Sequence, residues 1–346
     1  MSILPEENNT KICKNCIFHY SYPLSVPRKV IEVIYLAAMK RLYHFCITCH
    51  NEVLFRDGED IRNITNILAL ECFACGVELW ADAIMSTHLH GIAFAEEGQT
   101  VLCCQRLKMR ITKYHRNRHH GTGALFDPKH FLLPLDGNNH ILAAISYVLR
   151  NGLHHGQSAT PFSYPHCSAN YLFRRDLGKE PFAHAITLRT EIARYLPRRS
   201  EFPDHFAMER SGMLLRDSFE NLQMVEHYYR TPRCFDYYMS RLSGEEWQRE
   251  QLQDSVGDKP VTLDLLEPTT SYEPIAKMLA SEKGHSFSAS RLSDQDICRM
   301  IDGEYVPGYR ADSVYRLTQE QRRRIGEDLV RRLHAAPGQI RRCLAL

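Results

Sequence analysis

Two apolar runs separated by the dipeptide Ser-Thr place the strongest constraint on the fold. VELWADAIM spans residues 77–85 and HLHGIAF spans residues 88–94, and both runs are rich in residues that favour strands. A two-residue gap between such runs is typical of a tight turn between adjacent antiparallel strands. Because alternate residues of a strand share one face, we expect the imidazoles of His88 and His90 to point the same way.

The segments around this hairpin alternate between strand and helix patterns. Helical spacing of apolar residues, with terminal Gly or Asn punctuation, marks the helices, and β-branched and aromatic residues mark the strands. The segments are a strand within 43–55, a helix within 58–76, a helix over 98–119, a short strand within 121–131 and a helix over 138–152. The order predicts an α+β fold, in which helices flank a central, mainly antiparallel sheet.

Strand patterns fade after about residue 176, so we expect an all-helical C-terminal region. The predicted organisation has four parts: an N-terminal extension (1–30), the α+β domain (31–175), a helical region with a linker (176–280) and a second helical region (281–346).

The last 29 residues, 318–346, contain seven Arg and three acidic residues. They predict two helices joined by a turn at Ala336-Pro337-Gly338, with Arg341 and Arg342 facing outward. This layout fits a helix-turn-helix that binds DNA, and an ordinary helical hairpin is the alternative interpretation.

Composition excludes some classes of protein. The net charge of +2, 44% hydrophobic and 24% charged residues are ordinary for a globular chain. No stretch approaches the roughly 20 apolar residues that a membrane span needs, and the N-terminus lacks the apolar core of a signal peptide. We therefore expect a cytoplasmic protein that does not bind membranes.

Twelve cysteines include three C-x-x-C pairs: Cys13/Cys16, Cys46/Cys49 and Cys72/Cys75. Such pairs are zinc-binding patterns, so a structural zinc site from the first two pairs has to be considered. However, residues three apart in a strand face opposite sides, which argues against the second pair. Reduced, buried thiols are the favoured interpretation.

The predicted helix 98–119 carries a local basic charge. Residues 105–119 hold six Lys or Arg and no acid. Arg106, Arg110 and Lys113 form one stripe of the helix, which would suit contacts with phosphates. A solvated helix face is the alternative.

The helix 138–152 places a nucleophile near an amide. Tyr147 and Asn151 are four residues apart, so they lie on one stripe, which also includes His140. Two histidines on one strand face can bind a divalent cation with most of its coordination sphere open, and the Asn151 oxygen would be a third ligand. Taken alone, a tyrosine on a helix is usually a packing residue.

The combined motifs resemble the REP-associated branch of the one-tyrosine HUH transposases, which are insertion-sequence type single-strand DNA transposases. The resemblance covers roughly residues 40–175 and rests on FRDGED, FACGVELWADAIMSTHLHGIAF, YHRNRHHGTGALFDPKHF, ISYVLRNGLHHG and FSYPHCSANY, in that order. It implies that His88 and His90 are the family's histidine pair, Tyr147 its nucleophile and Asn151 its third metal ligand.

This resemblance implies an HUH-type catalytic domain that cleaves and rejoins single-stranded or hairpin DNA. Tyr147 would form a 5′-phosphotyrosine bond, with Mg²⁺ or Mn²⁺ held by the other three residues. Two departures suggest a divergent subgroup: Ser86-Thr87 where the family has Pro-Asn, and Gly152-Leu153 where it has Pro-Val.

Three other interpretations stay open. The chain could be a domesticated, non-mobilising DNA-binding protein derived from a transposase, a zinc-dependent interaction module, or a hydrolase without a covalent intermediate. The sequence does not decide between a monomer and a homodimer.

Overall fold

The computed structural model describes residues 39–346 apart from short gaps and two longer ones. The gaps are 50–51, 122–127, 156, 159, 181–185, 199, 241–262, 267–291 and 334. The predicted N-terminal extension (1–30) and the Cys13/Cys16 pair lie outside the described residues, as does most of the glycine-rich turn before the fourth strand.

Four antiparallel strands form the central sheet. The strands are β1 (Arg41–Thr48), β2 (Glu78–Ile84), β3 (His88–Ala95) and β4 (Lys129–Leu135). Their spatial order is β2-β3-β1-β4, and β2 and β3 form the hairpin that the Ser-Thr gap predicts. The predicted α+β class with an antiparallel sheet is confirmed.

The register between β1 and β3 decides which side chains share a face. Cys46 lies opposite His90, and Thr48 lies opposite His88. Directly opposed residues of an antiparallel pair project from the same side of the sheet, and so do residues two apart along one strand. His44 therefore projects from the same face as the two histidines of β3.

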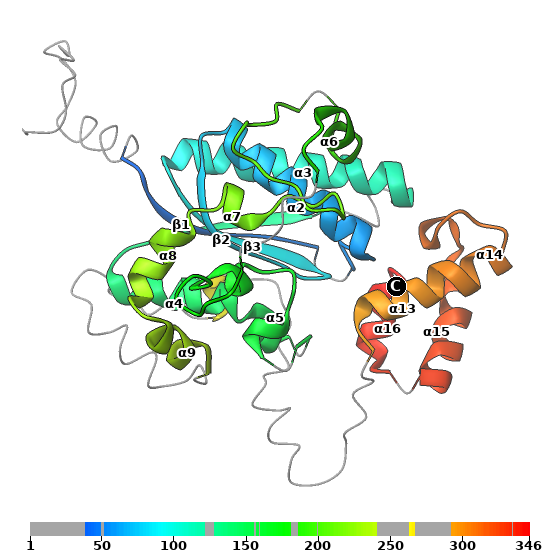
Figure 1. Ribbon diagram of the computed structural model, residues 1–346. Helices are drawn as coiled ribbons and strands as arrows, with labels where there is room; N and C mark the ends of the chain where they lie inside the picture. Colours follow the sequence, from blue (N-terminus) through cyan, green and yellow to red (C-terminus); the bar gives the residue numbers. More distant parts are fainter. Residues whose placement is uncertain are drawn as a thin grey trace, which may run out of the picture. The chain divides into compact units, whose positions relative to one another are not determined.

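Helices cover both faces of the sheet, and Figure 1 shows the two layers. On one side α2 (Gly58–Ala74) and α3 (Glu97–His119) pack against residues such as Phe45 and Leu89. On the other side α4 (Asn138–Leu149) packs on the sheet through Ala144 and Val148, as its spacing predicts.

Helix α4 is itself covered by later parts of the chain. The helices α8 (Leu222–Tyr229) and α9 (Pro232–Ser240) pack on it, and the hydroxyls of Ser146 and Tyr229 lie 2.8 Å apart. As a result, almost every residue of α4 is buried, including those on the stripe of Tyr147.

Shorter helical elements complete the middle of the chain. They are α5 (Asn151–His154), η1 (Pro161–Ser163), η2 (Ser168–Tyr171), α6 (Arg189–Tyr195), α7 (Arg216–Phe219) and α11 (Leu263–Leu266).

The described C-terminal residues, 292–333 and 335–346, are helical, as expected. They comprise α13 (Asp294–Met300), a π turn η4 (Ile301–Tyr305), α14 (Val306–Gly308), η5 (Val314–Arg316), α15 (Gln319–Leu333) and α16 (Pro337–Cys343). Helix α16 starts at Pro337, because proline is tolerated in the first turn, where its missing N–H is not needed.

The prediction that Arg342 faces outward is wrong. Its Nε and Nη2 donate to the two carboxylate oxygens of Asp294, at 2.8 and 2.7 Å. Asp294 is 2% exposed, and a buried carboxylate needs a charged or hydrogen-bonding partner. Ser86 also donates to Asp294, at 2.8 Å, so the C-terminal helices contact the turn that precedes His88.

Arg56 makes a second link between the C-terminal helices and the α+β domain. Its fully buried guanidinium donates to both carboxylate oxygens of Asp302, at 2.9 and 2.8 Å, and to the carbonyl of Cys343 at 2.9 Å. A buried arginine with this many partners fixes α16 beside the segment between β1 and α2.

None of the helices in the described segments combines the length and the apolar character required to cross a membrane.

The buried carboxylate of Asp60 ties the start of α2 to the end of α3. It accepts hydrogen bonds from Tyr114 at 2.8 Å and from His119 at 2.9 Å, and it pairs with Arg118. Burial opposes ionisation, but the hydrogen bond and charge of His119 and the charge of Arg118 outweigh it and lower the pKa of Asp60 from 3.8 to about 2.

We expect Asp60→Asn to destabilise the protein near neutral pH by about 2 kcal/mol, the value of a pKa shift of nearly two units. The ionised carboxylate of Asp60 stabilises the folded state above about pH 4. This contribution disappears as the pH falls from about 4 to about 2 and the carboxylate is protonated. Denaturant unfolding of both proteins across this range measures it. A difference in unfolding free energy that stays constant with pH would contradict the assignment.

Candidate active site

Strand β3 brings His88 and His90 together on the face that α4 covers. Their ring centroids lie 4.8 Å apart, and both side chains are almost fully buried. The cross-strand neighbour of His90 on β2 is the small residue Ala83.

The end of α4 supplies Tyr147 and Asn151 to the same place. The Tyr147 ring lies 5.4 Å from the His90 ring, edge to face, and Asn151 Oδ1 lies 3.0 Å from His88 Nε2. The helix continues almost without interruption through Arg150 into α5, so the two residues are one turn apart. The structure thus brings together all four residues that the sequence singles out for catalysis and metal binding.

His88 Nε2 and Asn151 Oδ1 lie at hydrogen-bond distance, and the same separation fits two ligands of one cation. Two ligands at right angles about a cation, each about 2.1 Å from it, lie about 3 Å apart. Thr87 Oγ1 lies 2.9 Å from His88 Nδ1, which leaves Nε2 as the nitrogen that faces Asn151. The amide nitrogen of Asn151 is buried, and it has no hydrogen-bond partner among the residues that the structure describes.

His44 is a member of the site that sequence reasoning missed. Its Nε2 lies 2.9 Å from His90 Nδ1, and the two rings stack with centroids 5.1 Å apart. This contact places Nδ1 of His90 against His44 and so helps to set the orientation of the His90 ring. The alternation of YHFCIT placed His44 on one face of its strand, but only the β1–β3 register shows that it is the face of the histidine pair.

His155 also lies close to the site. Its ring centroid is 4.7 Å from that of His88. His155 follows Asn151 by four residues and its backbone N–H donates to the Asn151 carbonyl, so both belong to the same helical turn. The cluster around His88 therefore contains more imidazoles than the sequence motif indicates.

In the described ranges, no three or more His, Cys, Asp or Glu side chains are arranged to hold a metal ion. The group of His88, His90 and Asn151 offers two imidazoles and one amide oxygen, a partial ligand set that leaves the other positions of an octahedral ion for water or substrate.

The cysteines of the two C-x-x-C pairs that the structure describes are buried, and no disulfide joins the described cysteines. Cys72 Sγ lies 3.8 Å from Cys103 Sγ, inside the core between α2 and α3. Burial also raises the pKa of the neighbouring Cys104 thiol to about 12, so the thiol is the stable form there.

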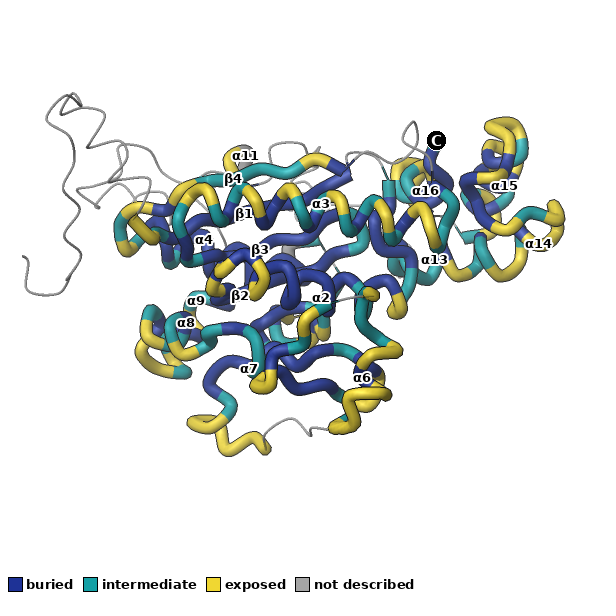
Figure 2. Tube along the Cα trace, turned by 90° about the horizontal axis from the view of Figure 1, so that it is seen from above, coloured by how far each residue is buried: buried dark blue, intermediate teal, exposed yellow. Residues whose placement is uncertain are grey.

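The predicted DNA-binding residues of α3 lie apart from the histidines, because α3 covers the opposite face of the sheet. Arg106 and Arg110 both pair with the buried carboxylate of Glu71, at 2.5 and 2.8 Å. Lys113 is exposed. Figure 2 shows the exposed positions along the outer side of α3, above the buried strands.

Three other tyrosines lie in the same part of the sequence: Tyr114, Tyr164 and Tyr171. Tyr164 donates to the carbonyl of Ile84 at 2.6 Å, and Tyr114 donates to Asp60. Burial raises the pKa of both phenols, and it raises the pKa of Tyr171 to about 12. Each of the three is therefore a poorer source of a phenolate than an ordinary tyrosine.

The candidate site is closed in this structure. Tyr147 is 4% exposed, and His90 and Asn151 have no exposed surface. Leu266 of α11 belongs to the same buried cluster as Tyr147, and α11 contacts β1. In this structure the phenol of Tyr147 is therefore not accessible to a macromolecule.

We expect Gly152→Ala to destabilise the protein by about 1–3 kcal/mol, because a methyl group there would lie 2.4 Å from the ring of Tyr164, which is buried and hydrogen-bonded. Gly98→Ala is the matched control, since its methyl group meets nothing within 4 Å and it lies in helix α3. Denaturant unfolding compares them. Equal stability of the two variants would show that the turn after Asn151 does not need glycine.

No protein-family model matches the chain, and no curated protein sequence matches it. Among solved structures, a match is found with the REP-associated tyrosine transposase bound to a REP hairpin, at 12% sequence identity and a TM-score of 0.30. The match covers 43% of this chain and 88% of that chain. At this identity and TM-score the likeness carries no conclusion about this chain.

Proposed function

We propose that this protein cleaves and rejoins single-stranded or hairpin DNA through a covalent bond to Tyr147. The observation that carries the proposal is the convergence of His88, His90, Asn151 and Tyr147 on one face of the sheet, with His88 Nε2 and Asn151 Oδ1 3.0 Å apart. The motif order that resembles the one-tyrosine HUH transposases supports the same assignment.

The proposed ligands of a divalent cation, Mg²⁺ or Mn²⁺, are His88 Nε2, His90 Nε2 and Asn151 Oδ1. When bound, it would make a DNA phosphate more electrophilic and neutralise its charge. The protein contributes the orientation of the ligands, because the Nδ1 atom of each histidine is already occupied by Thr87 or His44.

In the proposed reaction Tyr147 is the nucleophile. Its phenol oxygen attacks the phosphorus and loses its proton. The bond between phosphorus and the 3′ oxygen breaks, and that oxygen leaves as a 3′-hydroxyl. The product is a 5′-phosphotyrosine, and attack of a 3′-hydroxyl on it restores the DNA strand. Because the number of phosphodiester bonds is conserved, rejoining needs no external energy source.

The buried state of Tyr147 adds a requirement to the proposal. The substrate can reach the phenol only after the groups that bury it are displaced, because Tyr147 is 4% exposed. Exclusion of water from the closed site would also protect the covalent bond from hydrolysis, which favours strand transfer over simple cleavage.

We expect Tyr147→Phe to form no covalent adduct with single-stranded DNA, while its affinity for DNA stays within about twofold of the parent protein, because only the nucleophilic oxygen is removed. Tyr171→Phe, which removes a phenol oxygen elsewhere, is the control and should form the adduct. The measurement is intact-protein mass spectrometry after incubation with an oligonucleotide library and Mn²⁺.

An adduct on Tyr147→Phe would refute the assignment of the nucleophile. Cleavage by the parent protein with no adduct would instead indicate a hydrolase. Stoichiometric bound zinc without cleavage would favour the zinc-dependent module, and binding without cleavage would favour a domesticated DNA-binding protein.

We expect His44→Phe to weaken Mn²⁺ binding by about 10- to 100-fold, because it removes the partner that orients His90. His44→Gln should recover much of this loss, since its amide oxygen can accept from the Nδ1–H of His90. Titration calorimetry with Mn²⁺ measures both variants. Unchanged affinity in His44→Phe would show that His44 does not orient a metal ligand.

A further inference from the structure

A basic hollow lies on the α2–α3 side of the molecule. It has a volume of about 560 Å³, and α2, α3 and the segment 194–198 line it. Four of its lining residues are cationic, and no acidic residue lines it; the cations are Arg110, Lys113, Arg194 and Arg198. The concentration of one sign of charge around a concave surface attracts anions.

Three of these cations have no carboxylate partner in the part of the chain that the structure describes. Lys113, Arg194 and Arg198 are exposed, and no ion pair involves them, whereas Arg110 pairs with Glu71. Their charges are therefore not neutralised within the described protein. Tyr195 lines the same hollow with its ring beneath the guanidinium of Arg62, at 5.3 Å.

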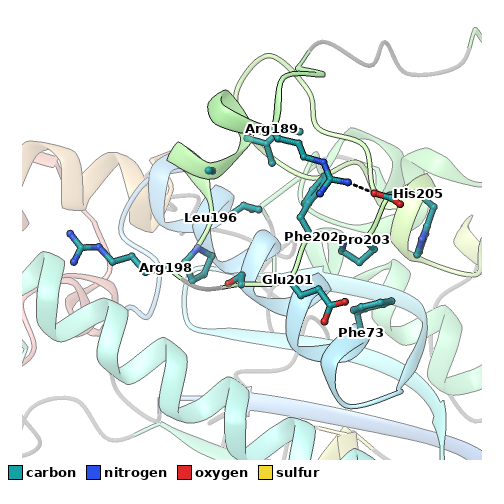
Figure 3. A pocket seen from close by; sticks show the side chains of 13 residues that line it. Phe73, Arg189, Leu196, Arg198, Glu201, Phe202, Pro203 and His205 are labelled. Carbon is teal, nitrogen blue, oxygen red and sulfur yellow. Dashed lines mark hydrogen bonds and ion pairs between the residues drawn. The ribbon is translucent and has the colours of Figure 1, made fainter.

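A second hollow, of about 1110 Å³, adjoins the first, and Leu196, Pro197 and Arg198 line both. Figure 3 shows Phe73 and His205 at one end of it and Arg198 at the other. Phe73 is 40% exposed, and its ring centroid lies 6.0 Å from that of His205. An exposed phenylalanine beside a hollow is a surface on which a flat ring can stack.

The charge of the second hollow differs from that of the first. Glu201 and Asp204 line it together with Arg189, and Asp204 pairs with Arg189. This mixed charge does not favour phosphate, but it is compatible with a neutral base. A phosphate-attracting hollow beside a stacking surface is the combination that proteins use for single strands.

From this arrangement we infer that the α2–α3 side binds single-stranded nucleic acid, with backbone phosphates at Lys113, Arg194 and Arg198 and a base stacked on Phe73. The inference rests on the proposed function in that the strand would be part of the same DNA substrate. Because α2 and α3 cover the face of the sheet opposite to His88, the bound stretch lies away from the phosphate that Tyr147 attacks.

The test compares the parent protein with Arg194→Glu/Arg198→Glu. Binding of fluorescein-labelled (dT)20 is measured by anisotropy in EDTA, so that it depends on neither metal nor cleavage. We expect the affinity for (dT)20 to fall by roughly tenfold or more at low salt. The plot of log K against log salt should also become less steep, by at least about 1.4 in the magnitude of its slope, which is the value for two contacts with a single strand.

The control is Arg175→Glu/Arg233→Glu. It changes the net charge equally, at exposed positions outside both hollows, and should retain the affinity for (dT)20.

The stacking component is tested with Phe73→Ala. We expect roughly tenfold weaker binding of (dT)20, since loss of one stacked base is worth about that factor, and unchanged binding of an abasic strand of the same length. Equal losses for the two strands would overturn the role of Phe73.

Two results would overturn the inference as a whole. One is that both double variants lose affinity equally, because the effect would then be one of net charge. The other is that a poly-glutamate peptide of matched charge displaces the labelled (dT)20 as effectively as unlabelled (dT)20 does. That result would indicate an acidic protein partner.

Failure here is distinguishable from failure of the proposed function. If the Arg194→Glu/Arg198→Glu protein binds (dT)20 like the parent while the parent forms the Tyr147 adduct, only the second contact is wrong. If the expected affinity losses appear and the parent forms no adduct, the binding surface stands and the catalytic proposal fails.

Discussion

The pairing of β1 with β3 is the constraint on which the candidate site depends. Its register sets Cys46 opposite His90 and thereby places His44 within 2.9 Å of the same imidazole. A shift by one residue would turn the histidines of β3 toward α2 and α3 and bring Leu89 to the other face. Apolar residues on both faces of these strands oppose such a shift, since it would exchange the contents of two separate cores.

Buried charged side chains connect the helices and segments that surround this sheet. Asp60 joins α2 to α3, while Arg56 and Asp294 join the C-terminal helices to the chain before α2 and to the turn before β3. Each of these groups is buried, so removing one partner leaves an uncompensated charge, which costs far more than an exposed ion pair contributes. Through Ser86, the C-terminal helices are thus in contact with the segment that presents His88.

Much of the fold could be predicted from the sequence, because local patterns determine it. The hairpin before His88, the helical spacing of α2 and α4, and the helical C-terminal region all follow from period and punctuation. The convergence of Tyr147 and Asn151 with the histidine pair followed from spacing together with a family resemblance. The contacts of His44 and His155 could not be predicted, because they depend on strand register and on packing between distant segments. The ion pairs of Glu71 with Arg106 and Arg110, and of Asp294 with Arg342, could not be predicted either. They join residues that are distant in the sequence.

We predict one binding position for a catalytic divalent cation, between the end of α4 and strand β3. The most direct measurement is anomalous X-ray scattering from crystals of the protein equilibrated with Mn²⁺. We predict an anomalous peak bonded to His88 Nε2, His90 Nε2 and Asn151 Oδ1, which should disappear in the His88→Ala protein. A manganese peak elsewhere, with none between these three atoms, would contradict the account.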